Sequence, residues 1–203
     1  MAYVYRETAS LAQAARLALW ANALVAAVAV GLSLGMGADS LIIGDIAFGF
    51  SLLQLVTGIG SLALFLIWFY RANANVRAMG ADGLMGSPGL SVAWFFIPIA
   101  FLFMPYVVVR DTWKASEAPR DGQGRSGRPL VGFWWAAMVI ANLASAISIR
   151  IALDGGYGAD EALGVLDFIS NLGAVAAGLL GAQLVAGIQG CQVSPAHLSE
   201  TFR

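Results

Sequence analysis

The chain has 203 residues, of which 59% are hydrophobic and only 11% are charged, and its mean hydropathy is +0.77. This composition leaves too little polar surface to cover a soluble globule, so it predicts an all-α integral membrane protein. The net charge of −1 excludes the basic surface that nucleic-acid binding requires. The single cysteine, Cys191, excludes an intramolecular disulfide and a cysteine-rich metal site.

Five apolar segments follow one another along the chain: 17–35, 46–70, 90–109, 130–152 and 162–189. A spanning helix requires about 20 residues, so hydropathy alone predicts five crossings. The first segment exceeds the roughly 7 to 15 apolar residues of a secretory signal, so we expect it to be retained. We interpret residues 1–203 as a single membrane domain. Its parts are a helical hairpin at 17–70, a central segment at 71–129, a second hairpin at 130–189 and a short polar tail at 190–203.

The distribution of basic residues gives an independent prediction, because Lys and Arg beside spanning helices stay in the cytoplasm while Asp and Glu have little weight. Bases occur in 1–16, 71–89 and 110–129, whereas 36–45 and 153–161 contain only acidic charges. Both flanks of 90–109 are therefore expected on the cytoplasmic side. We predict four transmembrane helices plus a re-entrant or kinked segment at about 90–109, with both termini cytoplasmic. Five spanning helices are the alternative.

Two prolines, Pro98 and Pro105, interrupt this central apolar segment. Each lacks an N–H and frees a carbonyl, which in hydrocarbon must find a partner within the protein. A bent hairpin held by four helices meets that requirement. A single kinked spanning helix is the alternative, because membrane helices tolerate proline.

An interfacial helix is predicted at about 107–118, where apolar and charged residues separate onto two sides. The apolar side would contain Val108, Thr112 and Ala115, and the water-facing side would contain Arg110, Asp111 and Lys114. We expect Trp113 to lie among the lipid headgroups, and Trp68 and Trp134 to belong to an aromatic belt at the cytoplasmic boundary.

The central part of the chain also carries a recognisable pattern. Its features are Trp68, Tyr70-Arg71-Ala72, Asn75, Ser87-Pro88-Gly89, Trp94-Phe95, Pro98-Ile99, Pro105, Trp113, Ala115-Ser116 and Trp134-Trp135. This pattern resembles an uncharacterised bacterial multi-pass membrane family, domain of unknown function 4328. Where that family commonly has an Asn after the Pro-Ile pair, this chain has Ala100-Phe101-Leu102. The resemblance implies a protein of the bacterial cytoplasmic membrane, and it implies no activity.

Charged and polar groups inside apolar segments are candidates for function, because they are costly there. Arg150 and Asp167 flank the short 153–161 connection and are expected to form an ion pair or to lie at the interface, with an ion or proton relay as the alternative. Uncharged polar groups recur at Asn22, Gln54, Asn142, Asn171 and Gln183. We interpret them as interhelical hydrogen-bonding groups rather than as the lining of an aqueous path.

Small residues recur at helical spacing in the last segment, for example Gly173, Ala177 and Gly181. Such faces let helix backbones approach closely. They predict either tight packing within the bundle or homo-oligomerisation.

No catalytic constellation, phosphate-binding loop or metal-ligand cluster is present in the sequence, so we expect neither an enzyme nor a bound cofactor. The favoured function is that of an accessory, scaffold or assembly subunit acting by helix–helix interaction. Its partners would be the lipid bilayer and either further copies of the chain or a larger membrane complex. One alternative is a small transporter or channel that uses the re-entrant segment. Another is lipid or hydrophobic-ligand binding beside the aromatic residues of 94–103.

Overall fold

The computed structural model describes residues 3–35, 41–117, 128–154 and 159–192. All regular secondary structure in these ranges is helical. The long helices are α1 (Ala9–Gly35), α2 (Leu41–Ala78), α5 (Arg128–Asp154) and α6 (Ala159–Gln192). Between α2 and α5 lie α3 (Pro88–Ala93), the short 3-10 helix η1 (Ala100–Leu102) and α4 (Met104–Glu117).

Four helices, namely α1, α2, α5 and α6, are long and apolar enough to span a membrane. The prediction of four such helices plus a broken central segment is confirmed. Among the described residues there is no fifth long helix: residues 90–109 are divided among α3, a series of turns, η1 and α4, which differs from the single kinked helix of the alternative.

The long helices extend beyond the apolar segments that predicted them. Helix α2 has 38 residues, which corresponds to about 57 Å at 1.5 Å per residue. The hydrocarbon core of a bilayer is only about 30 Å thick. Hydropathy marks the part of a helix that suits lipid, so it misses the polar continuation of α2 through Asn73, Asn75 and Arg77.

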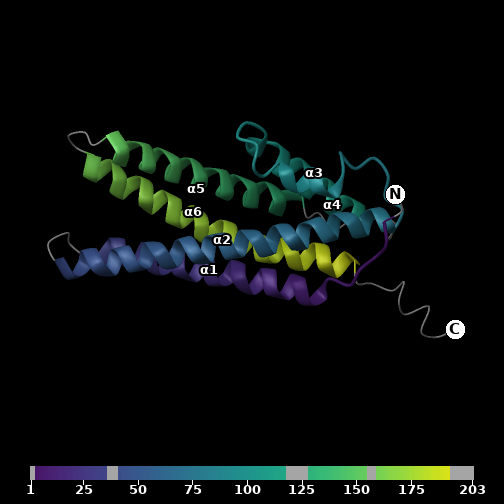
Figure 1. Ribbon diagram of the computed structural model, residues 1–203, viewed down its shortest axis with the longest axis horizontal. Helices are drawn as coiled ribbons and strands as arrows, with labels where there is room; N and C mark the ends of the chain where they lie inside the picture. The colour runs from purple at the N-terminus through teal and green to yellow at the C-terminus, as the bar shows by residue number, and fades with distance from the viewer. Residues whose placement is uncertain (1–2, 36–40, 118–127, 155–158, 193–203) are drawn as a thin grey trace.

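Helices α1 and α2 form one antiparallel hairpin, and α5 and α6 form the other (Figure 1). Helix α6 crosses between them, because it packs along both α5 and α1. Helices α3 and α4 lie at the end of the bundle where α1 and α5 begin and where α2 and α6 finish (Figure 1). We call this end the core end and the opposite end the far end.

The side chains of the core end form an aromatic centre. Phe65, Trp68, Phe69 and Trp134 are almost fully buried, and Phe95 from the central segment joins them. The rings of Phe65 and Phe69 stack with centroids 6.1 Å apart, and Phe95 meets both rings edge-on. Such pairs add about 0.5–1.5 kcal/mol each beyond the burial of their area. The central segment is therefore anchored by its first aromatic turn.

The connection from α2 to α3 follows standard capping chemistry. Helix α2 ends in a Schellman motif, in which Gly80, with φ +87°, donates to Arg77 O at 3.0 Å and Ala81 donates to Val76 O at 3.0 Å. Ser87 then caps α3 by accepting from the Leu90 N–H at 3.2 Å, and Pro88 occupies the first turn, where no N–H is needed.

The two prolines of the central segment are placed where a missing N–H costs little. Pro105 lies in the first turn of α4, and Pro98 lies in the irregular stretch before η1. The indole N–H of Trp135 on α5 donates to the Leu102 carbonyl at 3.1 Å. A neighbouring helix thus supplies the partner for a carbonyl that the segment itself leaves unpaired.

Helix α4 confirms part of the predicted pattern. Val108 and Thr112 are buried and Lys114 is exposed, as expected from the sequence. Arg110 and Asp111 are half-buried and pair with each other at 2.8 Å.

The prediction that Trp68, Trp113 and Trp134 face the lipid at the membrane boundary is wrong. Trp68 is fully buried, and Trp113 and Trp134 are only 9% and 4% exposed. Their positions in the sequence, next to basic residues, predicted contact with lipid headgroups. The rings instead pack inside the core end, together with buried residues of the central segment.

The small-residue positions of α6 are used inside the bundle. A methyl group on Gly173 would meet Ala141 of α5, and one on Gly178 would meet the Leu19 carbonyl and Ala23 of α1. Of the two roles predicted for these glycines, tight internal packing is therefore the one that the structure shows.

Candidate functional site

Polar side chains at the core end join α2, α4 and α6 in one hydrogen-bonded cluster. Gln192 at the end of α6 donates to the Ala72 carbonyl of α2 at 3.0 Å and to Ser116 Oγ of α4 at 3.1 Å. Asn73 of α2 donates to Thr112 Oγ1 of α4 at 2.8 Å. Gln192, Asn73, Thr112 and Ser116 are all buried, so these bonds fix α4 against the ends of α2 and α6.

A second part of this cluster holds the segment before α1. The Arg6 N–H donates to Asn75 Oδ1 at 3.0 Å, and Asn75 Nδ2 donates to the Arg6 carbonyl at 2.8 Å. Thr8 Oγ1 lies 2.9 Å from Gln189 Oε1, to which it donates, and Trp68 Nε1 donates to the same oxygen at 3.3 Å. Residues 6–8 are thereby attached to both α2 and α6.

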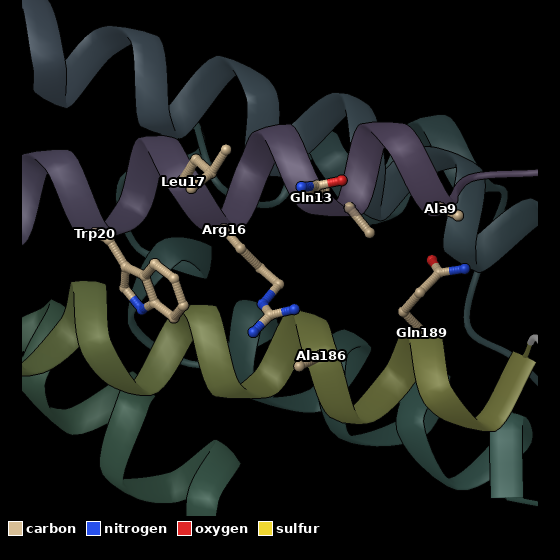
Figure 2. Close-up of a pocket in the computed structure, with 8 residues that line it drawn as sticks. Ala9, Gln13, Arg16, Leu17, Trp20, Ala186 and Gln189 are labelled. Carbon is tan, nitrogen blue, oxygen red and sulfur yellow. The ribbon is translucent and has the colours of Figure 1, made fainter.

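A groove of about 360 Å³ lies beside these contacts, between α1 and α6. Its lining from α1 consists of Gln13, Arg16, Leu17 and Trp20 with alanines at 9 and 12, and its lining from α6 consists of Ala186 and Gln189. Figure 2 shows Arg16 and Trp20 reaching from α1 towards α6, and Gln189 reaching back from α6.

The groove is electropositive. Arg16 is the only charged residue among those that line it, and its guanidinium carbon lies 5.3 Å from the centre of the Trp20 ring. Arg16 Nε and Gln189 Nε2 are buried and have no hydrogen-bond partner among the residues that the structure describes. The small side chains Ala12 and Ala186 line the groove beside these groups.

Arg150 and Asp167 do not form the predicted ion pair. Arg150 pairs instead with Asp154, one turn further along α5, at 3.3 Å, and its side chain is 74% exposed. Asp167 accepts a hydrogen bond from Ser148 Oγ at 2.7 Å. Arg150 reaches the end of its own helix more easily than it reaches α6, so the pairing prediction from loop length is wrong.

Most of the uncharged polar groups predicted to join helices lie near helix contacts. Gln54 of α2 donates to Asn171 of α6, and Thr57 of α2 donates to Asn22 of α1 at 3.2 Å. Among the described residues Asn142 bonds within its own helix, to Met138 O at 2.8 Å, and Gln183 is exposed. The prediction therefore holds for three of the five residues, namely Asn22, Gln54 and Asn171.

The remaining candidates from the sequence have structural positions. Trp68, Asn75 and Trp113 belong to the core end, where Trp113 Nε1 donates to Glu117 at 2.7 Å and its ring covers Gly187. Pro88 and Pro105 begin helices and are buried, whereas Pro98 is exposed. Arg71 and Trp94 are half-buried, and Trp94 Nε1 has no partner among the described residues.

Sequence reasoning missed the residues that complete the site: Thr8, Arg16, Asn73, Gln189 and Gln192. Arg16, Asn73 and Gln192 lie just beyond an apolar segment, Gln189 is the last residue of one, and Thr8 lies further upstream of the first. One signal in the sequence could have found them. Polar residues at helical spacing directly after an apolar run, such as Asn73 and Arg77 after residue 70, indicate that the helix continues beyond the run. Among the described residues no group of three or more His, Cys, Asp or Glu side chains is placed to hold a metal ion.

Outside the spanning helices, two groups of the described residues have shifted pKa values. The hydrogen bond to Asp111 raises the pKa of Arg110, which stays charged at any physiological pH. Burial raises the pKa of Tyr5 above its ordinary value of 10.0, and the nearby Glu7 charge adds to the effect.

These features define a helical membrane-type protein whose central segment is docked at one end of two hairpins. The chain belongs to a family that is known only as a domain of unknown function, DUF4328, whose model matches residues 43–190. The matched region includes α3, α4, α5 and nearly all of α2 and α6, and excludes α1. No curated protein matches the chain, and no solved structure does.

Proposed function

We propose that the protein is a non-enzymatic membrane subunit that acts by helix–helix interaction, as an accessory, scaffold or assembly component. The observation that supports this function is the unequal packing of the two ends. At the core end side chains are buried in aromatic and polar contacts, whereas α2 exposes Leu52, Leu55, Val56 and Ile59 towards the far end.

The opposite hairpin has a matching apolar surface. Helices α5 and α6 expose Ile147, Ile149, Val165 and Leu172 towards the same end, and the two hairpins lie apart there (Figure 1). Gly173 and Gly178 of α6 already pack against α5 and α1 inside the bundle. A partner would therefore contact these large aliphatic side chains. Dispersion contacts of this kind stabilise helix association in lipid.

We propose the following membrane placement for the chain. Arg6, Arg16, Arg71, Arg77, Arg110 and Lys114 all belong to the core end by their positions on the helices, whereas acidic residues predominate near the far end. By the positive-inside rule, the core end would be cytoplasmic. Residues 90–109 would then form a re-entrant segment, with both chain termini in the cytoplasm of a bacterial cell.

The transporter alternative has less support. It requires the central segment to line a path between the helices. Phe95 instead packs into the aromatic centre, and Phe96 and Ile99 are 64% and 79% exposed on the outside of the described bundle.

Site-specific photo-crosslinking in native membranes tests the proposal. A photoreactive residue at Leu55 or Ile147, both exposed on the far half, should give discrete protein adducts. The control position is Met79, which is exposed at the core end. Lipid adducts alone at Leu55 and Ile147, together with purification of only a lone monomer in mild detergent, would contradict the subunit function.

A further inference from the structure

The groove between α1 and α6 presents hydrogen-bond donors in a fixed orientation. Gln189 Oε1 already accepts from Thr8 and Trp68, and an indole N–H can only donate. Reversing the Gln189 amide would place Nε2 against the Trp68 N–H, so the indole fixes the amide orientation and leaves Nε2 without a partner among the described residues. With the Arg16 guanidinium beside it, and no Asp or Glu in the lining, the groove is suited to an anion.

The position of the groove indicates where that anion would come from. Arg16 directly precedes the apolar run 17–35, and Gln189 ends the run 162–189. The groove thus lies at the level where the lipid-suited part of both helices ends, which is the level of phospholipid headgroups. On the apolar side of Arg16, Leu17 and Trp20 are 54% and 45% exposed and offer a surface for an acyl chain.

We propose that this groove is a binding site for an anionic phospholipid. Arg16 and Gln189 Nε2 donate to the phosphate oxygens, and Leu17 and the Trp20 ring contact the start of an acyl chain. The small side chains of Ala12 and Ala186 give the headgroup room between the helices. This site is separate from the far-end surface of the proposed function, so either can fail without the other.

Native mass spectrometry of the full chain in detergent tests the site, with phosphatidylglycerol, phosphatidylcholine or inorganic phosphate added. We expect phosphatidylglycerol to be retained preferentially. Arg16→Gln should weaken retention about tenfold or more, the effect of losing a charge-assisted hydrogen bond. Gln189→Glu keeps the acceptor for Thr8 and Trp68 but replaces the donor by a negative oxygen, so it should weaken retention at least as much.

Two variants control for charge alone. Lys114→Gln removes an exposed base at the core end, and Arg150→Gln removes one near the far end; both should retain the lipid as the wild type does. Arg16→Lys keeps the charge and should lose only part of the affinity. Circular dichroism and a monodisperse elution profile establish that each variant is folded.

Several results would overturn the proposal. Equal retention by wild type, Arg16→Gln and Gln189→Glu would place the lipid elsewhere. An equal loss in Lys114→Gln would indicate nonspecific attraction. Displacement of the lipid by millimolar inorganic phosphate would identify a soluble anion as the ligand, and equal retention of phosphatidylcholine would remove the requirement for a net negative headgroup.

Discussion

Asn75 binds both main-chain groups of Arg6: its Oδ1 accepts from the Arg6 N–H at 3.0 Å and its Nδ2 donates to the Arg6 carbonyl at 2.8 Å. The Asn75 amide thus pairs with the Arg6 N–H and carbonyl, which in a strand or helix would bond to other backbone groups. Because Asn75 is 1% exposed, the pair excludes water. The segment before α1 is thus attached to a residue near the end of α2.

Replacing Asn75 by Leu should detach this segment. The change leaves the N–H and the carbonyl of Arg6 without partners, which costs about 1–3 kcal/mol for each group that stays buried. Hydrogen exchange in residues 3–8 should accelerate, and the thermal unfolding temperature in detergent should fall. Asn142→Leu is the matched control, because among the described residues Asn142 bonds to Met138 in its own helix. Equal effects of the two substitutions would contradict the role assigned to Asn75.

Gly178→Ala should separate α1 from α6. The added methyl would lie 2.8 Å from the Leu19 carbonyl and 2.9 Å from Ala23 Cβ, so backbone must move. Overpacking of this kind costs about 1–3 kcal/mol. Gly164→Ala in the same helix meets nothing within 4 Å and should leave stability unchanged or raise it by up to about 1 kcal/mol. Thermal unfolding of both variants in one detergent measures the difference.

Arg150→Gln should change the free energy of unfolding by no more than about 0.5 kcal/mol, as is usual for an exposed surface pair. A loss of several kcal/mol would instead indicate a buried partner such as Asp167. Chemical or thermal unfolding in detergent distinguishes the two outcomes.

Asp82 and Lys114 should lie on the same side of the membrane. Both are exposed, one between α2 and α3 and the other on α4. Single cysteines at these positions, introduced into a Cys191→Ser background, should react equally with an impermeant maleimide in inside-out vesicles and be protected in right-side-out vesicles. Labelling from opposite sides would show that the central segment crosses the membrane.

The Tyr5 hydroxyl should titrate above its ordinary pKa of 10.0, because burial and the Glu7 charge both disfavour the phenolate. A raised pKa in the folded state means that the Tyr5 contribution to stability is complete below the unfolded pKa. It is lost as the pH rises through the folded pKa. The difference in tyrosinate absorbance between wild type and Tyr5→Phe gives the midpoint, and a midpoint at or below 10.0 would contradict this assignment.

Composition and charge predicted the four long helices and the broken central segment. The bilayer sets the length of an apolar segment and the side on which Lys and Arg lie, so both can be read from the sequence without knowledge of tertiary contacts. The candidate site depends on pairs such as Asn75 with Arg6 and Gln192 with Ser116, which are distant in sequence. No periodicity reports those pairs. The sequence also places Trp68 and Trp113 at the membrane boundary, whereas both are buried. Hydropathy cannot distinguish a tryptophan at an interface from one that a returning segment covers.

The aromatic centre at the core end also has a mechanical consequence. There Phe65 of α2 meets Trp134 of α5, with ring centroids 5.6 Å apart and an interplanar angle of 37°. Nearer the far end, Gln54 and Asn171 supply a polar link between α2 and α6. A rotation of about 5° around the aromatic centre would displace helix ends some 40 Å away by about 3–4 Å, from the 1.5 Å rise per residue. The core end would then act as a pivot and the long hairpins as its lever arms.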